Sequence, residues 1–328
     1  MSRYFPLTRG QRGDAIRDLQ RRLTAAGFAP LGAEAGRYCA ATEHSVVEFQ
    51  GARGLRATGQ CDEQTWLALV EASWRLGDRL LVLTAPNMRG DDVAELQTAL
   101  GRIGFDCGRV DGILGPATAR AIEDFQRNCG LTVDGVCGVE TVRALDVLAR
   151  QSGAGPGVAT LRELETLTAS HRTLRDLRVV IGQFGGLSAL TRQLTHALRH
   201  RGATVAASDE PDATSQASTA NRFAATVYLG FEARAQPTST IWYYAVPSFE
   251  SVGGRSLAQH LVRTFDTVPG LVADSEGMRL PVLRETRMPA VLCALGPVQL
   301  VIDAAPALVD AVVEALAAWA ETPLHATN

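Results

Sequence analysis

The stretch that decides the fold of the C-terminal half reads Arg178-Val179-Val180-Ile181-Gly182-Gln183-Phe184-Gly185-Gly186. Its run of β-branched residues is typical of a buried strand, and its two final glycines are typical of a turn. A helical pattern starts at Leu187. In an α/β sheet, functional sites form where such a strand ends. This loop offers no His, Cys, Asp, Glu or Ser, and Phe184 stands where a catalytic or ligating side chain is expected.

Strand patterns alternate with helical patterns from residue 177 onward. Strands are predicted at 178–181, 204–207, 226–230, 240–244 and 290–295, and helices at 187–201, 254–265 and 307–320. This alternation predicts an α/β domain with an open, mostly parallel sheet flanked by helices.

Composition limits the function classes. The 328 residues are 46% apolar, which allows two or three domains with substantial cores. The net charge of −3 provides no basic face, so nucleic acid is not an expected partner. No run approaches the roughly 18 apolar residues of a membrane span, and the N-terminus lacks an export-signal core. A cytoplasmic location is therefore predicted, with the six cysteines reduced.

The N-terminal half contains an internal repeat. Its anchors are Arg9-Gly10, Leu19-Gln20, Leu23 and Gly27-Phe28, which recur as Arg89-Gly90, Leu96-Gln97, Leu100 and Gly104-Phe105. Each copy predicts a small three-helix bundle, with packing between the copies through Trp66, Trp74 and residues 80–83. The predicted domains are therefore 5–75, 86–150 and 174–321, with a linker at 151–173.

The second copy carries turn motifs at 110–118 and 134–141, and Ile122-Glu123-Asp124-Phe125-Gln126 between them. It resembles the peptidoglycan-binding-like repeat of bacterial cell-wall enzymes. The resemblance places the turn and groove residues at Asp111, Gly112, Gly115, Thr118, Gln126, Asp134 and Gly135. The first copy departs from the pattern, with Ala35-Gly36-Arg37 in place of the Asp-Gly turn. Both copies are alternatively scaffolding or protein-docking modules.

The α/β half resembles the zinc-dependent N-acetylmuramoyl-L-alanine amidases. The resemblance rests on Gly185-Gly186, on Thr219-Ala220-Asn221, on Tyr243-Tyr244 with Arg255-Ser256-Leu257-Ala258, and on the block from Val282 to Leu292. That family binds zinc with two His and one Glu, and a further Glu activates the bound water.

At the matching positions this chain has none of those groups. The two His positions fall on Phe184 and Phe231, the catalytic Glu on Ala294, and the ligand Glu in a deletion before Leu187. The resemblance therefore implies a pseudoenzyme without catalytic residues, metal or cofactor. Phe184 and Phe231 are expected to be near neighbours at adjacent strand ends, with both rings filling the place of the metal.

Other residues give weaker candidates. His196 and His200 have metal-ligand spacing but lie among arginines, so a solvated basic helix face is favoured. Cys293 has no nearby base in sequence, and Asp209-Glu210-Pro211-Asp212 is a solvated turn. A binding surface is predicted at Arg284, Thr286, Arg287, Met288, Tyr243 and Tyr244.

Two repeats followed by a zinc-less amidase-like domain resemble the actinobacterial CwlM-type group. That resemblance implies a regulator of peptidoglycan precursor synthesis that contacts a MurA-like enolpyruvyl transferase or the lipid II flippase machinery, under Ser/Thr kinase control. Thr322 and Thr327 are the threonines of the C-terminal tail. Two alternatives stay open: a true zinc amidase, which would require zinc, and a sensor that binds muropeptide through the second repeat.

Overall fold

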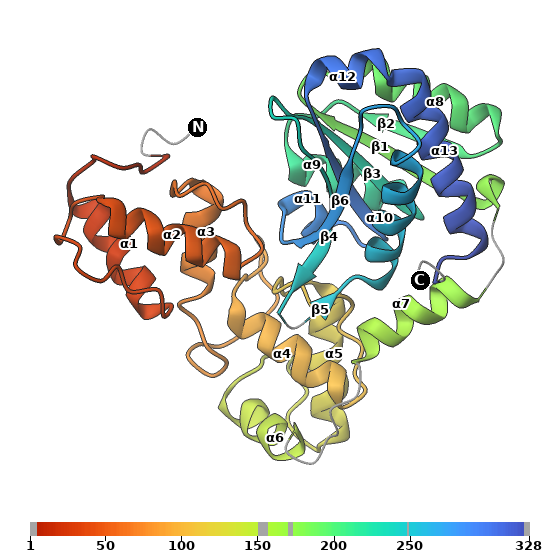
Figure 1. Cartoon of the computed structure of the whole chain (residues 1–328). Coiled ribbons are helices and arrows are strands. Elements are labelled where there is room, and N and C mark those ends of the chain that lie inside the picture. The colour runs from red at the N-terminus through yellow and green to blue at the C-terminus, as the bar shows by residue number, and fades with distance from the viewer. Residues whose placement is uncertain (1–4, 150–156, 170–172, 248, 325–328) are drawn as a thin grey trace. The chain divides into compact units, whose positions relative to one another are not determined.

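The computed structural model describes residues 5–149, 157–169, 173–247 and 249–324. The chain forms two compact units, Met1–Ala159 and Thr160–Asn328 (Figure 1). Among the helices of these described segments, none combines the length and the apolar character needed to cross a membrane.

The first unit contains both predicted three-helix repeats. Repeat 1 has α1 (Asp14–Ala25), α2 (Ala40–Ala52) and α3 (Glu63–Glu71), and repeat 2 has α4 (Asp91–Arg102), α5 (Pro116–Asn128) and α6 (Val139–Ala149). The cores match closely. Phe28 and Phe49 pack edge to face with centroids 5.5 Å apart, as do Phe105 and Phe125.

The structure shifts the repeat register by three residues at its start. Gly13 precedes α1 and Gly90 precedes α4 as the N-cap, and Arg12 bridges Arg37 as Arg89 bridges Ile113. Arg12-Gly13 is therefore the counterpart of Arg89-Gly90, and the predicted match with Arg9-Gly10 is wrong. The two Arg-Gly pairs of the first copy could not be told apart by sequence alone.

The predicted packing between the repeats through leucines is also wrong. Leu80 is 61% exposed and Leu83 is 43% exposed. Trp66 packs within repeat 1, 5.7 Å from the Phe5 ring. Antiparallel bridges instead close each repeat, Leu7 with Cys61 and Leu81 with Cys137.

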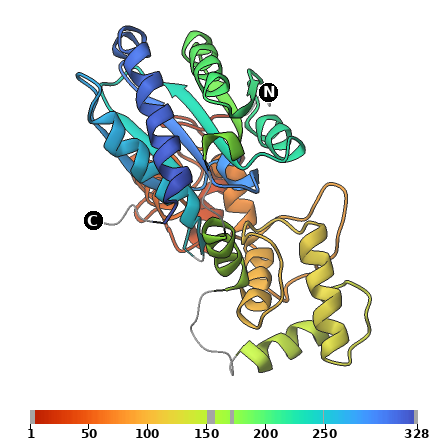
Figure 2. The ribbon, with the colours of Figure 1, turned by 90° about the vertical axis from the view of Figure 1, so that its right-hand side faces the viewer.

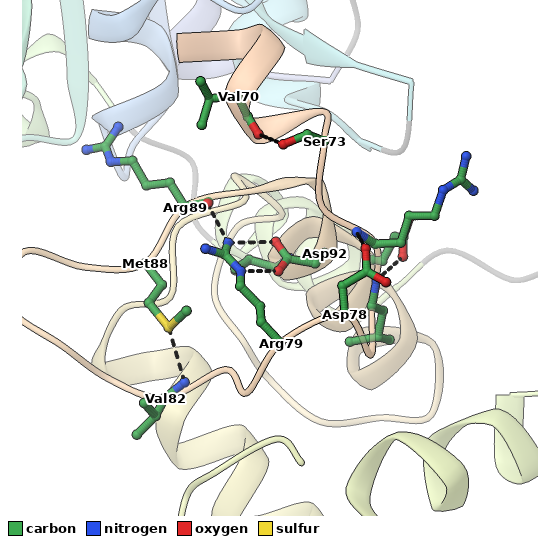
Figure 3. Close-up of polar contacts among 12 residues, drawn as sticks. Val70, Ser73, Asp78, Arg79, Val82, Met88, Arg89 and Asp92 are labelled. Atoms are coloured by element: carbon green, nitrogen blue, oxygen red, sulfur yellow. Dashed lines mark hydrogen bonds and ion pairs between the residues drawn. The ribbon is translucent and has the colours of Figure 1, made fainter. Parts of the chain in front are cut away.

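A buried ion pair fastens the connector between the repeats onto α4. Arg79 Nε donates to Asp92 Oδ2 at 2.6 Å, and Nη2 donates to the Arg89 carbonyl at 2.7 Å (Figure 3). The guanidinium carbon also lies 4.5 Å from the Trp74 ring centroid. Asp92 is fully buried, so this pair fixes the direction of residues 79–92.

The second unit is built on one sheet with strand order β2-β1-β3-β7-β4-β5, and β6 pairs with β4. The strands are β1 (Arg178–Phe184), β2 (Thr204–Ser208), β3 (Val227–Ala233), β4 (Ser239–Val246), β5 (Phe249–Glu250), β6 (Ala273–Met278) and β7 (Ala290–Leu295). β1, β2, β3 and β7 run parallel, and β4 pairs antiparallel with β7. The mostly parallel sheet is confirmed.

Helices cover both faces of this sheet. The large core lies under α8 (Ser188–His200), α10 (Val252–Phe265) and α13 (Ala305–Glu321), and Figures 1 and 2 show α10 and α13 side by side there. The opposite face carries α9 (Ala213–Arg222) and α11 (Pro281–Glu285). The sequence patterns did not predict α9, α11, β6 or the short helices α12 (Val298–Asp303) and η1 (Leu174–Asp176).

The predicted linker at 151–173 contains a docked helix. In α7 (Val158–Thr168), Leu167 is buried in the core of the second unit. Glu163 accepts hydrogen bonds from the Ser251 hydroxyl at 2.7 Å and the Val252 amide at 3.1 Å, at the start of α10. The α/β unit therefore begins before residue 174, while residues 150–156 and 170–172 lie outside the described residues.

Candidate functional site

The strands whose carboxyl ends carry the predicted site residues lie next to one another. β1 pairs with β3 and β3 pairs with β7, all parallel, so their carboxyl ends meet at one edge of the sheet. In register, Phe184 stands opposite Glu232, and Glu232 stands opposite Ala294. The three residues predicted at metal and catalytic positions, which are Phe184, Phe231 and Ala294, therefore lie at neighbouring strand ends.

Phe184 and Phe231 are neighbours, but their rings do not share one space. Phe231 is the register partner of Gln183, one residue before Phe184. Because side chains alternate between the two faces of a strand, Phe184 and Phe231 project from opposite faces. Phe231 is buried in the core under α8, α10 and α13, whereas Phe184 is half-buried. The predicted neighbourhood is confirmed, and the predicted filling of one metal hole by both rings is wrong.

A buried amide chain that sequence reasoning missed holds this strand end in place. The Tyr228 hydroxyl donates to Gln216 Oε1 at 2.6 Å, and Gln216 Nε2 donates to the carbonyls of Gln183 at 3.1 Å and Glu210 at 2.6 Å. Gly182 makes room for it, since a Cβ there would lie 1.8 Å from Gln216 Oε1. Gly182 within a strand was the available sequence signal.

The Gln183 side chain closes the glycine loop from the other face. Its Oε1 accepts from the Leu187 amide at 3.1 Å, and its Nε2 donates to Ser188 Oγ at 3.1 Å and Asp209 Oδ1 at 3.2 Å. An amide side chain therefore ties the ends of β1 and β2 to the first turn of α8. In this loop the side-chain polar atoms of Gln183 serve the fold.

The charged groups at this edge do not fit a zinc ion. Arg234 Nε lies 3.7 Å from Glu232 Oε1, and the guanidinium carbon lies 4.7 Å from the Trp242 ring centroid. A guanidinium beside the carboxylate of the central strand would repel a metal cation. Phe184, Phe231 and Ala294 supply no donor atom, and within the described residues no three His, Cys, Asp or Glu gather to hold a metal.

Two of the weaker candidates lie at this edge, where Asp209 accepts a hydrogen bond from Gln183 and Cys293 is the register partner of Phe231. Cys293 is fully buried on the face opposite Ala294, and burial raises the pKa of its thiol far above the ordinary value. His196 and His200 are both exposed on α8, as a solvated helix face predicts. Thr322 is exposed after α13 and donates to the Ala318 carbonyl at 3.0 Å, while Thr327 lies outside the described residues.

The predicted binding surface lies at the other edge of the sheet. Tyr243 is the register partner of Val291 near the start of β7, because β4 runs antiparallel to β7. Arg284, Thr286 and Tyr244 are buried, so they cannot form the exposed part of a binding surface. Arg287 is exposed, and Met288 and Tyr243 are half-buried.

Asn221 explains why this segment is built as it is. Its Nδ2 donates to the Glu285 carbonyl at 2.8 Å, and its Oδ1 accepts from the Arg287 amide at 3.0 Å. One amide side chain thus fixes both sides of residue 286. The matching motifs around Asn221 and 284–288 are therefore parts of one joint between α9 and the chain after α11.

The turn residues of repeat 2 serve two buried glutamines. Gln97 Oε1 accepts from the Gly112 amide at 2.9 Å, and its Nε2 donates to Thr118 Oγ1 and Asp111 Oδ1. Gln126 makes the same set with Gly135, Thr141 and Asp134. Gly115 is the N-cap of α5. The predicted groove residues thus hold the two turns in shape.

Repeat 1 keeps this device without the aspartates. Gln20 Oε1 accepts from the Gly36 amide at 2.8 Å and Nε2 donates to Thr42 Oγ1 at 3.1 Å. Gln50 does the same with Gly59 at 3.0 Å and Thr65 at 2.9 Å. Repeat 1 therefore lacks the two hydrogen bonds that Asp111 accepts in repeat 2, from Gln97 Nε2 and the Ile113 amide, and the glutamine-to-glycine bond of the turn is kept.

Comparison with known proteins agrees with this architecture. The family model of a peptidoglycan binding domain matches residues 12–69 and 89–145. "N-acetylmuramoyl-L-alanine amidase CwlM" of Mycobacterium tuberculosis is 32% identical over 332 residues, which is 88% of this chain and 80% of that protein. "Probable N-acetylmuramoyl-L-alanine amidase" of Bacillus licheniformis is 36% identical over 38% of this chain and 40% of its own.

Among solved structures, the amidase Ami1 of Mycobacterium smegmatis aligns with 14% identity and a TM-score of 0.38, over 45% of this chain and 98% of its own. The alignment with the relative from Mycobacterium tuberculosis is long enough to include both repeats and the α/β unit. The chain therefore belongs to the CwlM family, in which peptidoglycan-binding repeats precede an N-acetylmuramoyl-L-alanine amidase-like domain.

Proposed function

We propose that this chain is a non-hydrolytic member of its family that regulates or scaffolds peptidoglycan precursor synthesis through protein contacts. The observation that carries the proposal is the strand-end row of Phe184, Glu232 and Ala294 with Arg234 beside it. Zinc amidase chemistry needs three ligands, an open position and a carboxylate base. This row offers one carboxylate, and it faces a guanidinium.

The proposed partners follow from the family resemblance and the cytoplasmic location proposed with it. They are a MurA-like enolpyruvyl transferase and the lipid II flippase machinery. A precursor enzyme captured from native cytosol should change its rate when the purified chain is added. Capture without any change in rate would count against regulation, and a scaffold role would then require the chain to bring two pathway components together.

The test of inactivity uses the full chain. Zinc content by elemental analysis should be far below one ion per chain, and incubation with muramyl-peptides should release no peptide. One zinc per chain together with peptide release would replace the proposal by the amidase alternative, which the names of the relatives favour.

A muropeptide sensor is the second candidate, favoured by the match of both repeats to a peptidoglycan binding domain. Calorimetry with muropeptides and with UDP-linked precursors tests it. Binding that is lost in a variant of repeat 2 would support the sensor. Absence of heat with both ligands would remove it and leave the protein-contact role.

A further inference from the structure

One face of repeat 2 is aliphatic and open to solvent. It consists of Leu80, Val82, Leu83, Val136 and Val139, called here the aliphatic face. Leu81 and Cys137 form the antiparallel bridge beneath it and are both buried. Their chain neighbours 80, 82 and 136 alternate outward, and Leu80 and Val139 are 61% and 59% exposed.

Repeat 1 provides an internal control for this face. Its equivalent bridge joins Leu7 and Cys61, and α3 begins at Glu63 where α6 begins at Val139. The five positions that correspond to the aliphatic face carry Pro6, Thr8, Arg9, Gln60 and Glu63. Both repeats form the same three-helix fold, so the fold does not require aliphatic residues at these positions.

Repeat 2 also has a different residue at the helix-capping position. In repeat 1, Asp62 caps α3 by accepting from the Thr65 amide at 2.8 Å. Repeat 2 has Gly138 at this position, and a Cβ there would lie 3.4 Å from Leu80 Cδ2. Gly138 has no side chain to cap α6, and a glycine in place of a capping aspartate typically costs a few tenths of a kcal/mol, on the order of 0.3. A cluster of exposed aliphatic residues where the other repeat carries polar ones points to a use outside the fold.

The border of the aliphatic face is acidic. Asp78, Asp134 and Glu140 are exposed and lie within two residues of its members. Arg79, next to Asp78 in the chain, is paired with Asp92 (Figure 3). Its guanidinium also lies over the Trp74 ring. Repeat 1 has Thr58 and Gln64 where repeat 2 has Asp134 and Glu140. A complementary surface therefore carries aliphatic side chains with cations at its rim.

We propose that the aliphatic face docks a protein partner that presents an aliphatic stripe bordered by Lys or Arg. The face has no aromatic ring and no hydrogen-bonding side chain among its five members, which disfavours a sugar. This inference rests on the proposed role as an interaction protein and assigns that role a surface. It does not depend on which pathway enzyme is the partner.

The test titrates the full chain with two synthetic helical peptides. Both carry a leucine stripe, one bordered by lysines and the other by glutamates. The lysine peptide should bind at least tenfold more tightly than the glutamate peptide, and less tightly at higher salt. The double variant Leu80→Ser with Val139→Ser should weaken lysine-peptide binding at least tenfold. The repeat 1 variant Thr8→Ser with Gln60→Ser, at the counterparts of Val82 and Val136, should not. Thermal unfolding checks that both variants fold.

A gain-of-function variant keeps the test independent of folding losses. Pro6→Leu, Thr8→Val, Gln60→Val and Glu63→Val together should give repeat 1 an added, weaker site, since its acidic border is absent. Equal binding by wild type and the double variant would overturn the inference. A wild-type dimer that becomes monomeric in the double variant would also overturn it. Muropeptide binding that is lost in the double variant would do the same. None of these results would change the outcome of the zinc and hydrolysis tests. Peptide release in the hydrolysis test would likewise not change the peptide-binding result.

Discussion

Phe184 and Phe231 lie one register step apart on adjacent parallel strands, and their side chains project from opposite faces of the sheet. The two positions that the family resemblance assigns to His ligands therefore project from different faces of the sheet in this chain. Restoring the residue types alone should not restore the site.

The first prediction concerns that restoration. The triple variant Phe184→His, Phe231→His and Ala294→Glu should bind far less than one zinc per chain, because the two imidazoles point apart and Arg234 stays beside Glu232. Elemental analysis after dialysis measures it, with the wild type as control. One tightly bound zinc per chain would show that the strand end rearranges and that the register argument fails.

The second prediction concerns the buried amide chain. Gln216→Ala should destabilise the second unit by about 2–4 kcal/mol, because the Gln183 and Glu210 carbonyls and the Tyr228 hydroxyl lose their partner. Tyr228→Phe removes one donor and should cost about 1–2 kcal/mol. Urea unfolding measures both, with the exposed Gln193→Ala as control. Equal stability of Gln216→Ala and the control would contradict it.

The third prediction separates glutamine from aspartate in the repeat turns. Gln97→Ala should cost about 2–4 kcal/mol of unit 1 stability, since the Gly112 amide and Thr118 hydroxyl lose a buried partner. Asp111→Ala should cost less, about 1 kcal/mol, because repeat 1 builds the same turn around Gln20 without it. Denaturant unfolding with the exposed Gln64→Ala as control gives the ranking. A larger loss for Asp111→Ala would reverse the assignment.

The fourth prediction concerns pH. Burial lowers the pKa of His260, with a backbone hydrogen bond to Thr322 opposing that effect and Arg263 adding to it. The unfolded chain therefore binds this proton at higher pH, near 6.5 for a free histidine. Between the unfolded and folded pKa values the unfolded state binds more protons, so stability falls as pH drops below about 6.5. Unfolding free energies from pH 7.5 to 5 should fall more steeply in wild type than in His260→Gln.

The substitution His196→Gln on the exposed face of α8 provides the control for that measurement. A slope unchanged by His260→Gln would mean that other groups carry the pH dependence.

The sequence by itself determined the repeat, the mostly parallel sheet and the identity of the side chains at the strand ends. Each of these depends on local signals: helical periodicity, β-branched runs between glycine turns, and the identity of side chains at strand ends. It could not place α9 and α11, whose short sequences form helices where they pack on the second face of the sheet. The sequence also matched Arg89-Gly90 to Arg9-Gly10 instead of Arg12-Gly13, because the first copy contains two Arg-Gly pairs close together.

Tertiary structure alone decided which residues face one another. Strand register set Phe184 and Phe231 on opposite faces, and antiparallel β4 moved Tyr243 and Tyr244 to the edge away from Phe184. Burial turned Thr118, Gln126 and Thr286 from surface candidates into fold-holding groups. The physical reason is that a side chain's role depends on its face and its burial, and both are set by pairing between segments far apart in the chain.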